Sequence, residues 1–170
     1  MKNTIYLDYA ATTPIDPDVW TQMEKVAFHH FGNPSSLHLY GEQAEELMEE
    51  AKSKLSYLIG ARPGKVILTS GGTESNNLAL KGVAHHYATQ GNHLVVSAIE
   101  HDAILATCRT LEKEGLQITY LPVNQYGQVD LDALSAAITD QTLLVSIMHA
   151  NNETGTIQPV KQIGQIIRHK

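Results

Sequence analysis

Short apolar runs alternate with helical patterns from Val66 onward, and this alternation constrains the fold of the chain more than any other feature. Each run has the length of a buried strand, and each is followed by apolar residues at helical spacing. A repeated strand–helix order predicts an α/β fold with a mostly parallel sheet flanked by helices. We predict strands at residues 66–70, 94–99, 117–122 and 142–149. A helix follows each strand: the first ends near Gly91, the second spans 102–114, the third follows a cap at Asp130, and the fourth begins at Val160.

The first strand-to-helix junction, Gly71-Gly72-Thr73, has the composition of an anion-binding turn. The first N–H groups of a helix have no intrahelical acceptor, and the helix dipole adds about half a positive charge there. Glycine lets the backbone approach phosphate oxygens, and the Thr73 hydroxyl could donate to one of them. The alternative is a tight turn with Thr73 as N-cap and no ligand. Neither the P-loop spacing nor the dinucleotide-binding glycine spacing is present.

Residues 1–60 lack the alternation and predict two helices. Asp16 is placed to cap the first helix, with Pro17 in its first turn, and the helix extends to about His30. A polar loop at 31–38 then precedes a long helix that ends at Gly60. Residues 4–9 predict a short strand or an extended arm. The long helix carries one apolar face, which consists of Ala44, Leu47, Met48, Ala51, Leu55, Leu58 and Ile59. Opposite this face, Glu50 and Lys54 form a favourable i,i+4 pair.

Composition and charge exclude several classes of protein. The 170 residues are 42% hydrophobic and 18% charged, which is typical of one globular domain or a piece of a larger one. The net charge of -6 argues against nucleic acid or an anionic membrane as the main partner. No apolar run reaches transmembrane length, the N-terminus opens no signal peptide, and the histidines form no familiar zinc motif. Cys108 is the only cysteine, so we expect no internal disulfide and a cytoplasmic location.

Polar residues follow three of the predicted strands. Ligands of open α/β sheets bind outside the carboxyl ends of the strands. His101 could stack on a ligand or exchange protons with it, and Asn152 could donate to a ligand oxygen. Each has an alternative, because His101 could instead cap the next helix and Asn152 could only shape a turn. Taken together, the three strand ends predict a phosphorylated small molecule as ligand; they are residues 70–73, 100–102 and 149–153.

Five segments in this order resemble the cysteine desulfurases, and more closely the iron–sulfur-cluster group of these enzymes within the class V aminotransferase family. The similarity extends over essentially all of the chain but covers only the N-terminal part of such an enzyme. The segments are residues 7–14 (LDYAATTP), 31–36 (FGNPSS), 69–76 (TSGGTESN), 100–101 (EH) and 146–155 (SIMHANNETG).

The resemblance implies a pyridoxal 5'-phosphate cofactor and a role for four residues. Gly72 and Thr73 would hold the cofactor phosphate. His101 would stack on the pyridine ring and shuttle protons, and Asn152 would bond the phenolic oxygen of the ring or the substrate. The implied fold is part of the large domain of a fold-type I pyridoxal-phosphate enzyme. The implied reaction converts L-cysteine to L-alanine and leaves sulfur as an enzyme persulfide. A homodimer and an iron–sulfur scaffold or other sulfur-acceptor protein are the implied partners.

The same resemblance implies that the chain lacks part of the catalytic machinery. The Schiff-base lysine, the aspartate that pairs with the pyridine nitrogen, the substrate-carboxylate arginine and the persulfide cysteine of the family all lie beyond Lys170. We therefore expect residues 1–170 to be an N-terminal portion that is inactive alone. The alternatives are a fragment of a selenocysteine lyase or another class V lyase or aminotransferase, and a non-catalytic binding or dimerisation remnant.

Cys108 does not replace the missing nucleophile. It shares the apolar face of its predicted helix with Ile104, Leu105 and Leu111, at i−4, i−3 and i+3. A cysteine in that pattern is typical of an inert thiol in the core. We expect Cys108 to be buried and structural.

Overall fold

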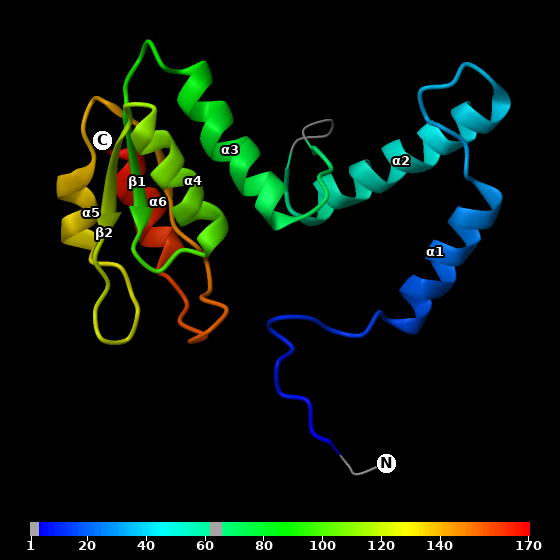
Figure 1. The fold of residues 1–170 in the computed structure, drawn as a ribbon, viewed down its shortest axis with the longest axis horizontal. Coiled ribbons are helices and arrows are strands. Elements are labelled where there is room, and N and C mark those ends of the chain that lie inside the picture. The colour runs from blue at the N-terminus through cyan, green and yellow to red at the C-terminus, as the bar shows by residue number, and fades with distance from the viewer. Residues whose placement is uncertain (1–3, 62–65) are drawn as a thin grey trace. The chain divides into compact units, whose positions relative to one another are not determined.

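The computed structural model describes residues 4–61 and 66–170, whose fold is drawn in Figure 1. The chain divides into two compact units, Met1–Leu68 and Thr69–Lys170. Among the described residues, the first contains two helices and no strand, and the second contains the parallel sheet with its covering helices. The predicted α/β class is therefore confirmed, and it belongs to the second unit.

The first unit contains two helices, α1 (Pro17–His29) and α2 (Leu39–Leu58). Asp16 caps α1 as predicted, because its Oδ1 atom accepts hydrogen bonds from the N–H groups of Asp18 (2.8 Å) and Val19 (3.4 Å). Gly60 follows α2 with φ of 65°, the left-handed conformation that ends many helices. The predicted Glu50–Lys54 ion pair is present at 2.6 Å on an exposed surface.

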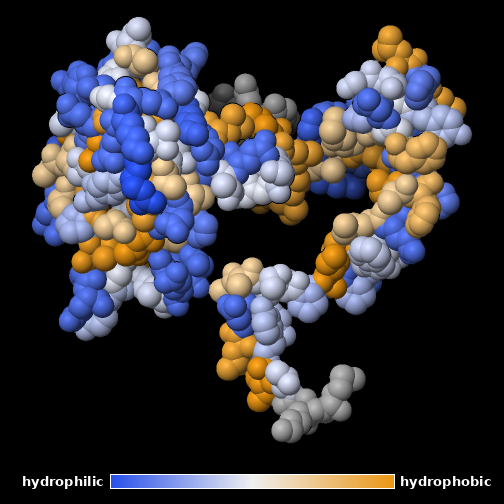
Figure 2. All heavy atoms as spheres, viewed as in Figure 1, coloured by the Kyte–Doolittle hydropathy of each residue, from blue (hydrophilic) through white to orange (hydrophobic). Residues whose placement is uncertain are grey.

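The apolar residues of these two helices are mostly exposed within their own unit. No residue of α1 is buried, and only Gly41 and Ser56 are buried in α2. Figure 2 shows hydrophobic side chains along the surface of both helices. Residues 4–9 form no strand, which leaves the extended-arm alternative, and a turn follows in which Ala11 N–H donates to the Asp8 carbonyl (3.1 Å).

The second unit is built on three parallel strands, β1 (His93–Ser97), β2 (Gln117–Leu121) and β3 (Thr142–Ser146), in the order β2-β1-β3. Helix α3 (Gly72–His86) precedes β1. The crossover helices are α4 (Asp102–Lys113) after β1 and α5 (Leu131–Ala137) after β2, and α6 (Val160–Arg168) follows β3. The Asp130 carboxylate caps α5 as predicted.

Helices cover both faces of the sheet. β1 is central and completely buried, and its side chains alternate between two hydrophobic clusters. One cluster lies against α3 and α4, and the other lies against α5 and α6. The first contains Leu80, Ala84, Leu94, Val96, Ile104, Cys108 and Leu111, and the second contains Val95, Leu121, Val129, Leu134 and Ile163.

The prediction of a strand at residues 66–70 is wrong. Residues 66–69 have no regular secondary structure, and Ile67 and Leu68 are 73% and 52% exposed. A strand exists only when a neighbour completes its hydrogen-bonded ladder. The strands of the described residues pair only with one another, so the apolar pattern alone does not make this segment a strand. β1 and β3 also end earlier than predicted, at Ser97 and Ser146, because the chain leaves the ladder there.

His93 connects all three strands at the start of β1, a contact that the sequence did not predict. Its Nδ1 atom lies 2.8 Å from Thr142 Oγ1 on β3, and its Nε2 atom lies 2.9 Å from Thr119 Oγ1 on β2. The side chain is buried, and burial lowers the pKa of the imidazole. The neutral ring has one donor and one acceptor, so it can satisfy both hydroxyls without carrying a charge into the sheet.

Candidate functional site

A cavity of about 400 Å³ lies at the carboxyl ends of β1 and β3. This is the edge of a parallel sheet where ligands bind in α/β proteins. Two of the four predicted site residues, His101 and Asn152, line it together. The complete lining is Ile99, Glu100, His101, Asp102, Asn151, Asn152, Glu153 and Thr154.

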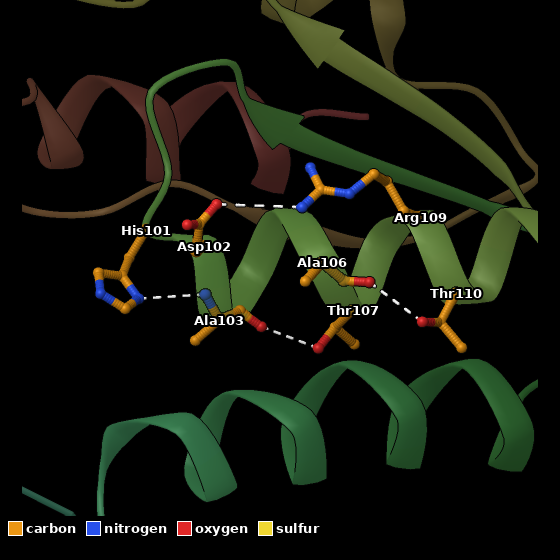
Figure 3. A network of polar contacts seen from close by, with 7 residues as sticks. All are labelled: His101, Asp102, Ala103, Ala106, Thr107, Arg109 and Thr110. Atoms are coloured by element: carbon orange, nitrogen blue, oxygen red, sulfur yellow. Dashed lines mark hydrogen bonds and ion pairs between the residues drawn. The ribbon is translucent and has the colours of Figure 1, made fainter.

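His101 stands at the N-cap of α4, as Figure 3 shows. Its Nδ1 atom accepts a hydrogen bond from the N–H of Ala103 at 3.1 Å. The capping alternative is therefore confirmed for this histidine. Capping does not use the whole ring, because the side chain is exposed at the cavity and only Nδ1 is engaged. In the neutral ring Nε2 then carries the proton and remains available to a ligand.

The other contacts drawn in Figure 3 lie within α4. Thr107 donates its hydroxyl hydrogen to the Ala103 carbonyl at 2.8 Å, and Thr110 does the same to Ala106 at 3.1 Å. The exposed Arg109 guanidinium lies 3.9 Å from the Asp102 carboxylate. A solvated ion pair of that length contributes little to stability.

Asn152 lies in the loop after β3, exposed and at the cavity. The turn itself is made by its neighbour: Asn151 Oδ1 accepts from the N–H groups of Glu153 and Thr154, both at 2.9 Å. The alternative that Asn152 only shapes the turn therefore applies better to Asn151. The Asn152 side chain makes no hydrogen bond within the described part of the chain, so its amide is available to a ligand.

Glu100 is a site residue whose role the sequence did not predict. Its side chain is only 8% exposed, and its Oε1 atom accepts from the Ser97 hydroxyl at 2.7 Å and from the Met148 N–H at 2.6 Å. Asn151 makes the reciprocal connection, donating from Nδ2 to the Ile99 carbonyl at 3.2 Å. The sequence indicates this role only by a carboxylate directly before His101. The Met148 N–H that it accepts from lies 48 residues away along the chain.

The glycine turn begins α3 at Gly72, and the N-cap is Gly71, not Thr73. No side chain caps this helix start, and the Thr73 hydroxyl has no hydrogen-bond partner among the described residues. Glu74 instead reaches back to Ser70, accepting from its N–H at 2.7 Å and from its hydroxyl at 2.6 Å. These bonds lower the pKa of Glu74. The first N–H groups of α3 therefore remain without a side-chain acceptor.

The fold of the chain itself does not require glycine at positions 71 and 72. Neither residue has the left-handed conformation that favours glycine, and a Cβ atom added at either would meet no atom within 4 Å. The space beside this turn is open, and the first N–H groups of α3 have no side-chain acceptor. That arrangement fits a bound phosphate group.

The glycine turn and His101 lie at the same end of a helix pair. α3 packs along α4, and His85 near the end of α3 lies 3.0 Å from Glu114 at the end of α4. The two helices therefore run in the same direction, as Figure 1 also shows. Their starts, Gly72 and Asp102, face the same end of the second unit. Gly72 and Thr73 do not line the cavity, so the glycine turn shares this end of the unit with His101 but is not part of the cavity.

Cys108 is completely buried in the cluster between the sheet and α4, as predicted. Burial, with smaller contributions from the negative charges of Glu112 and Glu100, raises the pKa of the thiol to about 11. A thiol with that pKa and no access to solvent is a poor nucleophile.

Within residues 4–61 and 66–170, no group of three or more His, Cys, Asp or Glu side chains is arranged to hold a metal ion. The same residues contain no helix with the length and apolar character needed to cross a membrane.

Curated relatives are similar over nearly the whole chain. A protein of Dictyoglomus turgidum named cysteine desulfurase IscS is 49% identical over 168 residues, which are 99% of this chain and 43% of the relative. A Rickettsia africae protein of the same name is 53% identical over 167 residues, 98% of this chain and 41% of the relative. The chain thus spans about two fifths of the length of these relatives.

Solved structures of similar proteins also match nearly the whole chain. A NifS-like protein matches with a TM-score of 0.95 at 38% identity, over 98% of this chain and 46% of the other. A structure of SspA in complex with cysteine matches with a TM-score of 0.92 at 38% identity, over 98% of this chain and 48% of the other. Residues 5–170 match the family described as aminotransferase class-V, and the chain belongs to this family.

Proposed function

We propose that this chain forms the N-terminal part of a pyridoxal-phosphate-dependent cysteine desulfurase. The observation that carries the proposal is the cavity that His101 and Asn152 line together at the strand ends, with the uncapped start of α3 at the same end of the unit. Relatives named cysteine desulfurase that are about half identical over nearly the whole chain support the specific activity.

Class V aminotransferases and cysteine desulfurases are pyridoxal-phosphate enzymes. When bound, the cofactor supplies an electron sink for a carbanion at the substrate. In this chain the N–H groups of the α3 start and the hydroxyl of Thr73 would hold the phosphate, with Gly72 leaving room for its oxygens. His101 would stack on the ring, and Asn152 would bond the phenolic oxygen of the ring or the substrate.

The hydrogen bonds of His101 define what its ring can do. Nδ1 is committed to the Ala103 N–H, so the proton of the neutral ring sits on Nε2. His101 therefore holds or donates a proton at Nε2 while α4 keeps the ring in place. A ring fixed in this way is suited to general acid–base work beside a bound ligand.

L-cysteine is the proposed substrate, L-alanine the product, and sulfur is passed to an iron–sulfur scaffold or another acceptor protein. The match to SspA, which was solved in complex with cysteine, supports this substrate class. The buried Cys108 is unsuited to receive the sulfur, so the persulfide cysteine, like the cofactor lysine, would come from residues outside 1–170. A cytoplasmic homodimer is the proposed setting. Selenocysteine lyases would use the same site residues, but the relatives reported above favour desulfuration.

Binding of pyridoxamine 5'-phosphate to the 170-residue chain tests the proposal. This probe keeps the ring and the phosphate of the cofactor but has no aldehyde, so it forms no imine with surface lysines. Equilibrium dialysis should show saturable binding, stronger than that of pyridoxamine, and His101→Ala should weaken it. His86→Ala is the matched control, because His86 is also exposed but stands at the opposite end of α3. Equal binding of both probes, or equal loss in both variants, would contradict the proposal.

A further inference from the structure

The ladder between β1 and β3 ends before the site begins. Its last paired residues are Val96 and Ser146. The site residues lie beyond this point, so backbone pairing does not set the distance between the two loops that carry them. Some other contact must hold the loops together if a cavity of fixed shape is to exist between them.

Two side-chain hydrogen bonds cross between these loops in opposite directions. From the β1 side, Glu100 Oε1 accepts from the N–H of Met148 at 2.6 Å. From the β3 side, Asn151 Nδ2 donates to the carbonyl of Ile99 at 3.2 Å. Each side chain is also fixed at its own loop, Glu100 by the Ser97 hydroxyl at 2.7 Å and Asn151 by the N–H of Glu153 at 2.9 Å.

The hydrogen bond that Glu100 accepts is the stronger of the two that cross between the loops. A carboxylate that accepts from N–H and O–H groups makes shorter and stronger hydrogen bonds than a neutral amide does. The side chain is nearly buried, and it forms no ion pair with any described Lys, Arg or His. Burial of an unpaired carboxylate is unfavourable unless hydrogen bonds satisfy it. An ordinary core position would hold an apolar residue, so packing alone does not explain a glutamate here.

Each of the two predicted site residues at the cavity directly follows one of these connections, His101 after Glu100 and Asn152 after Asn151. We propose that Glu100 is a positioning residue: its carboxylate holds the β3 loop against the end of β1 and thereby sets the spacing of His101 and Asn152 across the cavity. The effect on ligand binding rests on the proposed function, whereas the effect on spacing does not.

NMR of the labelled 170-residue chain tests the spacing directly. Glu100→Ala removes the acceptor, and Glu100→Gln keeps an oxygen in the same place. In Glu100→Ala the Met148 amide should exchange with solvent about tenfold faster or more, relative to Val95 in β1. The ring signals of His101 and the side-chain amide signals of Asn152 should both shift. Glu100→Gln should restore most of the protection and most of the signal positions.

Leu134→Ala serves as the control, because it destabilises the cluster under α5 and α6 and removes neither of the hydrogen bonds that cross between the loops. It should leave the His101 and Asn152 signals in place. Unchanged Met148 protection in folded Glu100→Ala, or equal signal shifts in Leu134→Ala, would overturn the proposal. So would a Glu100→Gln variant that behaves like Glu100→Ala.

Binding of pyridoxamine 5'-phosphate separates this proposal from the proposed function. If the unaltered chain binds the probe, Glu100→Ala should weaken binding severalfold and Glu100→Gln much less. Unaltered affinity in Glu100→Ala would then overturn the positioning role. If the unaltered chain does not bind the probe, the proposed function is contradicted, and the NMR signals still decide whether Glu100 sets the spacing.

Discussion

The N–H of Ala103 donates a hydrogen bond to Nδ1 of His101 at 3.1 Å, so the histidine at the cavity is also the cap of α4. One nitrogen of the ring stabilises the helix, and the other makes no hydrogen bond within the described residues. This double use ties the orientation of the ring to the start of the helix. It also means that substitutions can separate the contribution of His101 to the stability of the second unit from its role in ligand binding.

Replacement of His101 by Asn and by Ala should separate the two roles. Asn is a good N-cap, so His101→Asn should keep the stability of the second unit, whereas His101→Ala should lose about 0.5–2 kcal/mol. Both variants lack the ring and should bind pyridoxamine 5'-phosphate more weakly. Urea unfolding followed by circular dichroism and equilibrium dialysis measure the two effects. Full binding by either variant would rule out a role for the ring.

The double change Gly72→Ala and Thr73→Val should weaken binding of the probe much more than it weakens folding. The two changes remove one hydroxyl donor and fill the space next to the α3 start, and loss of a charge-assisted hydrogen bond costs about 1.5–3 kcal/mol, or tenfold to a hundredfold in affinity. Folding should change little, because Gly72 is not left-handed and a Cβ there meets no neighbour. Unchanged affinity in the folded variant would show that the glycine turn does not bind the phosphate.

Cys108 should be chemically silent in the native chain. With a pKa of about 11 and no exposure, it should react with a thiol reagent such as dithionitrobenzoate only after denaturant is added. Cys108→Ala should lower the free energy of unfolding by about 1–2 kcal/mol, as a small core truncation does. Rapid labelling of the folded chain would contradict the structural role.

The second unit should lose stability as the pH falls below about 6.5 because of His93. Burial lowers the pKa of the folded imidazole from its ordinary 6.5, so acid protonates the unfolded chain first. The contribution of His93 is therefore complete above pH 6.5 and declines as the pH falls toward the folded pKa. His93→Gln should be less stable at pH 8 and should show a smaller decline between pH 7 and pH 5.5. An equally steep decline in the variant would assign the effect to other groups.

The 170-residue chain should release no sulfide from L-cysteine beyond what free pyridoxal phosphate releases. Nucleophile and cofactor anchor act as a unit, and the loss of either is not replaced by neighbours. Cys108 is buried and cannot substitute. A sulfide assay on pure chain, with free cofactor as the control, checks this. Release well above the control would mean that residues 1–170 contain a working nucleophile.

Features set by neighbouring residues were predictable from the sequence. The Asp16 cap before Pro17 and Gly60 after α2 depend on contacts within a few positions, and the structure has both. The apolar runs of β1–β3 also predicted strands, which the structure has. The cavity position of His101 and Asn152 followed from the rule that parallel strands end at one edge. Burial of Cys108 followed from helical spacing.

Features set by distant residues were not predictable. Residues 66–70 have the composition of a strand, but a strand depends on a partner that the pattern does not identify. The bond from Glu100 to Met148 and the contact of His93 with two threonines depend on the register of strands that lie far apart in the sequence. Side chains that cross between elements become visible only when the register is known.

The lack of buried apolar residues in α1 has a consequence for how the chain unfolds. Most of the stability of a short helix in a protein comes from packing, and within its own unit α1 has no buried residue. Its amides should open by local fraying at a small free energy, whereas those of the central strand β1 should exchange only when the whole sheet is lost. The isolated chain should therefore not melt in one cooperative step, and a single midpoint temperature would describe only Thr69–Lys170.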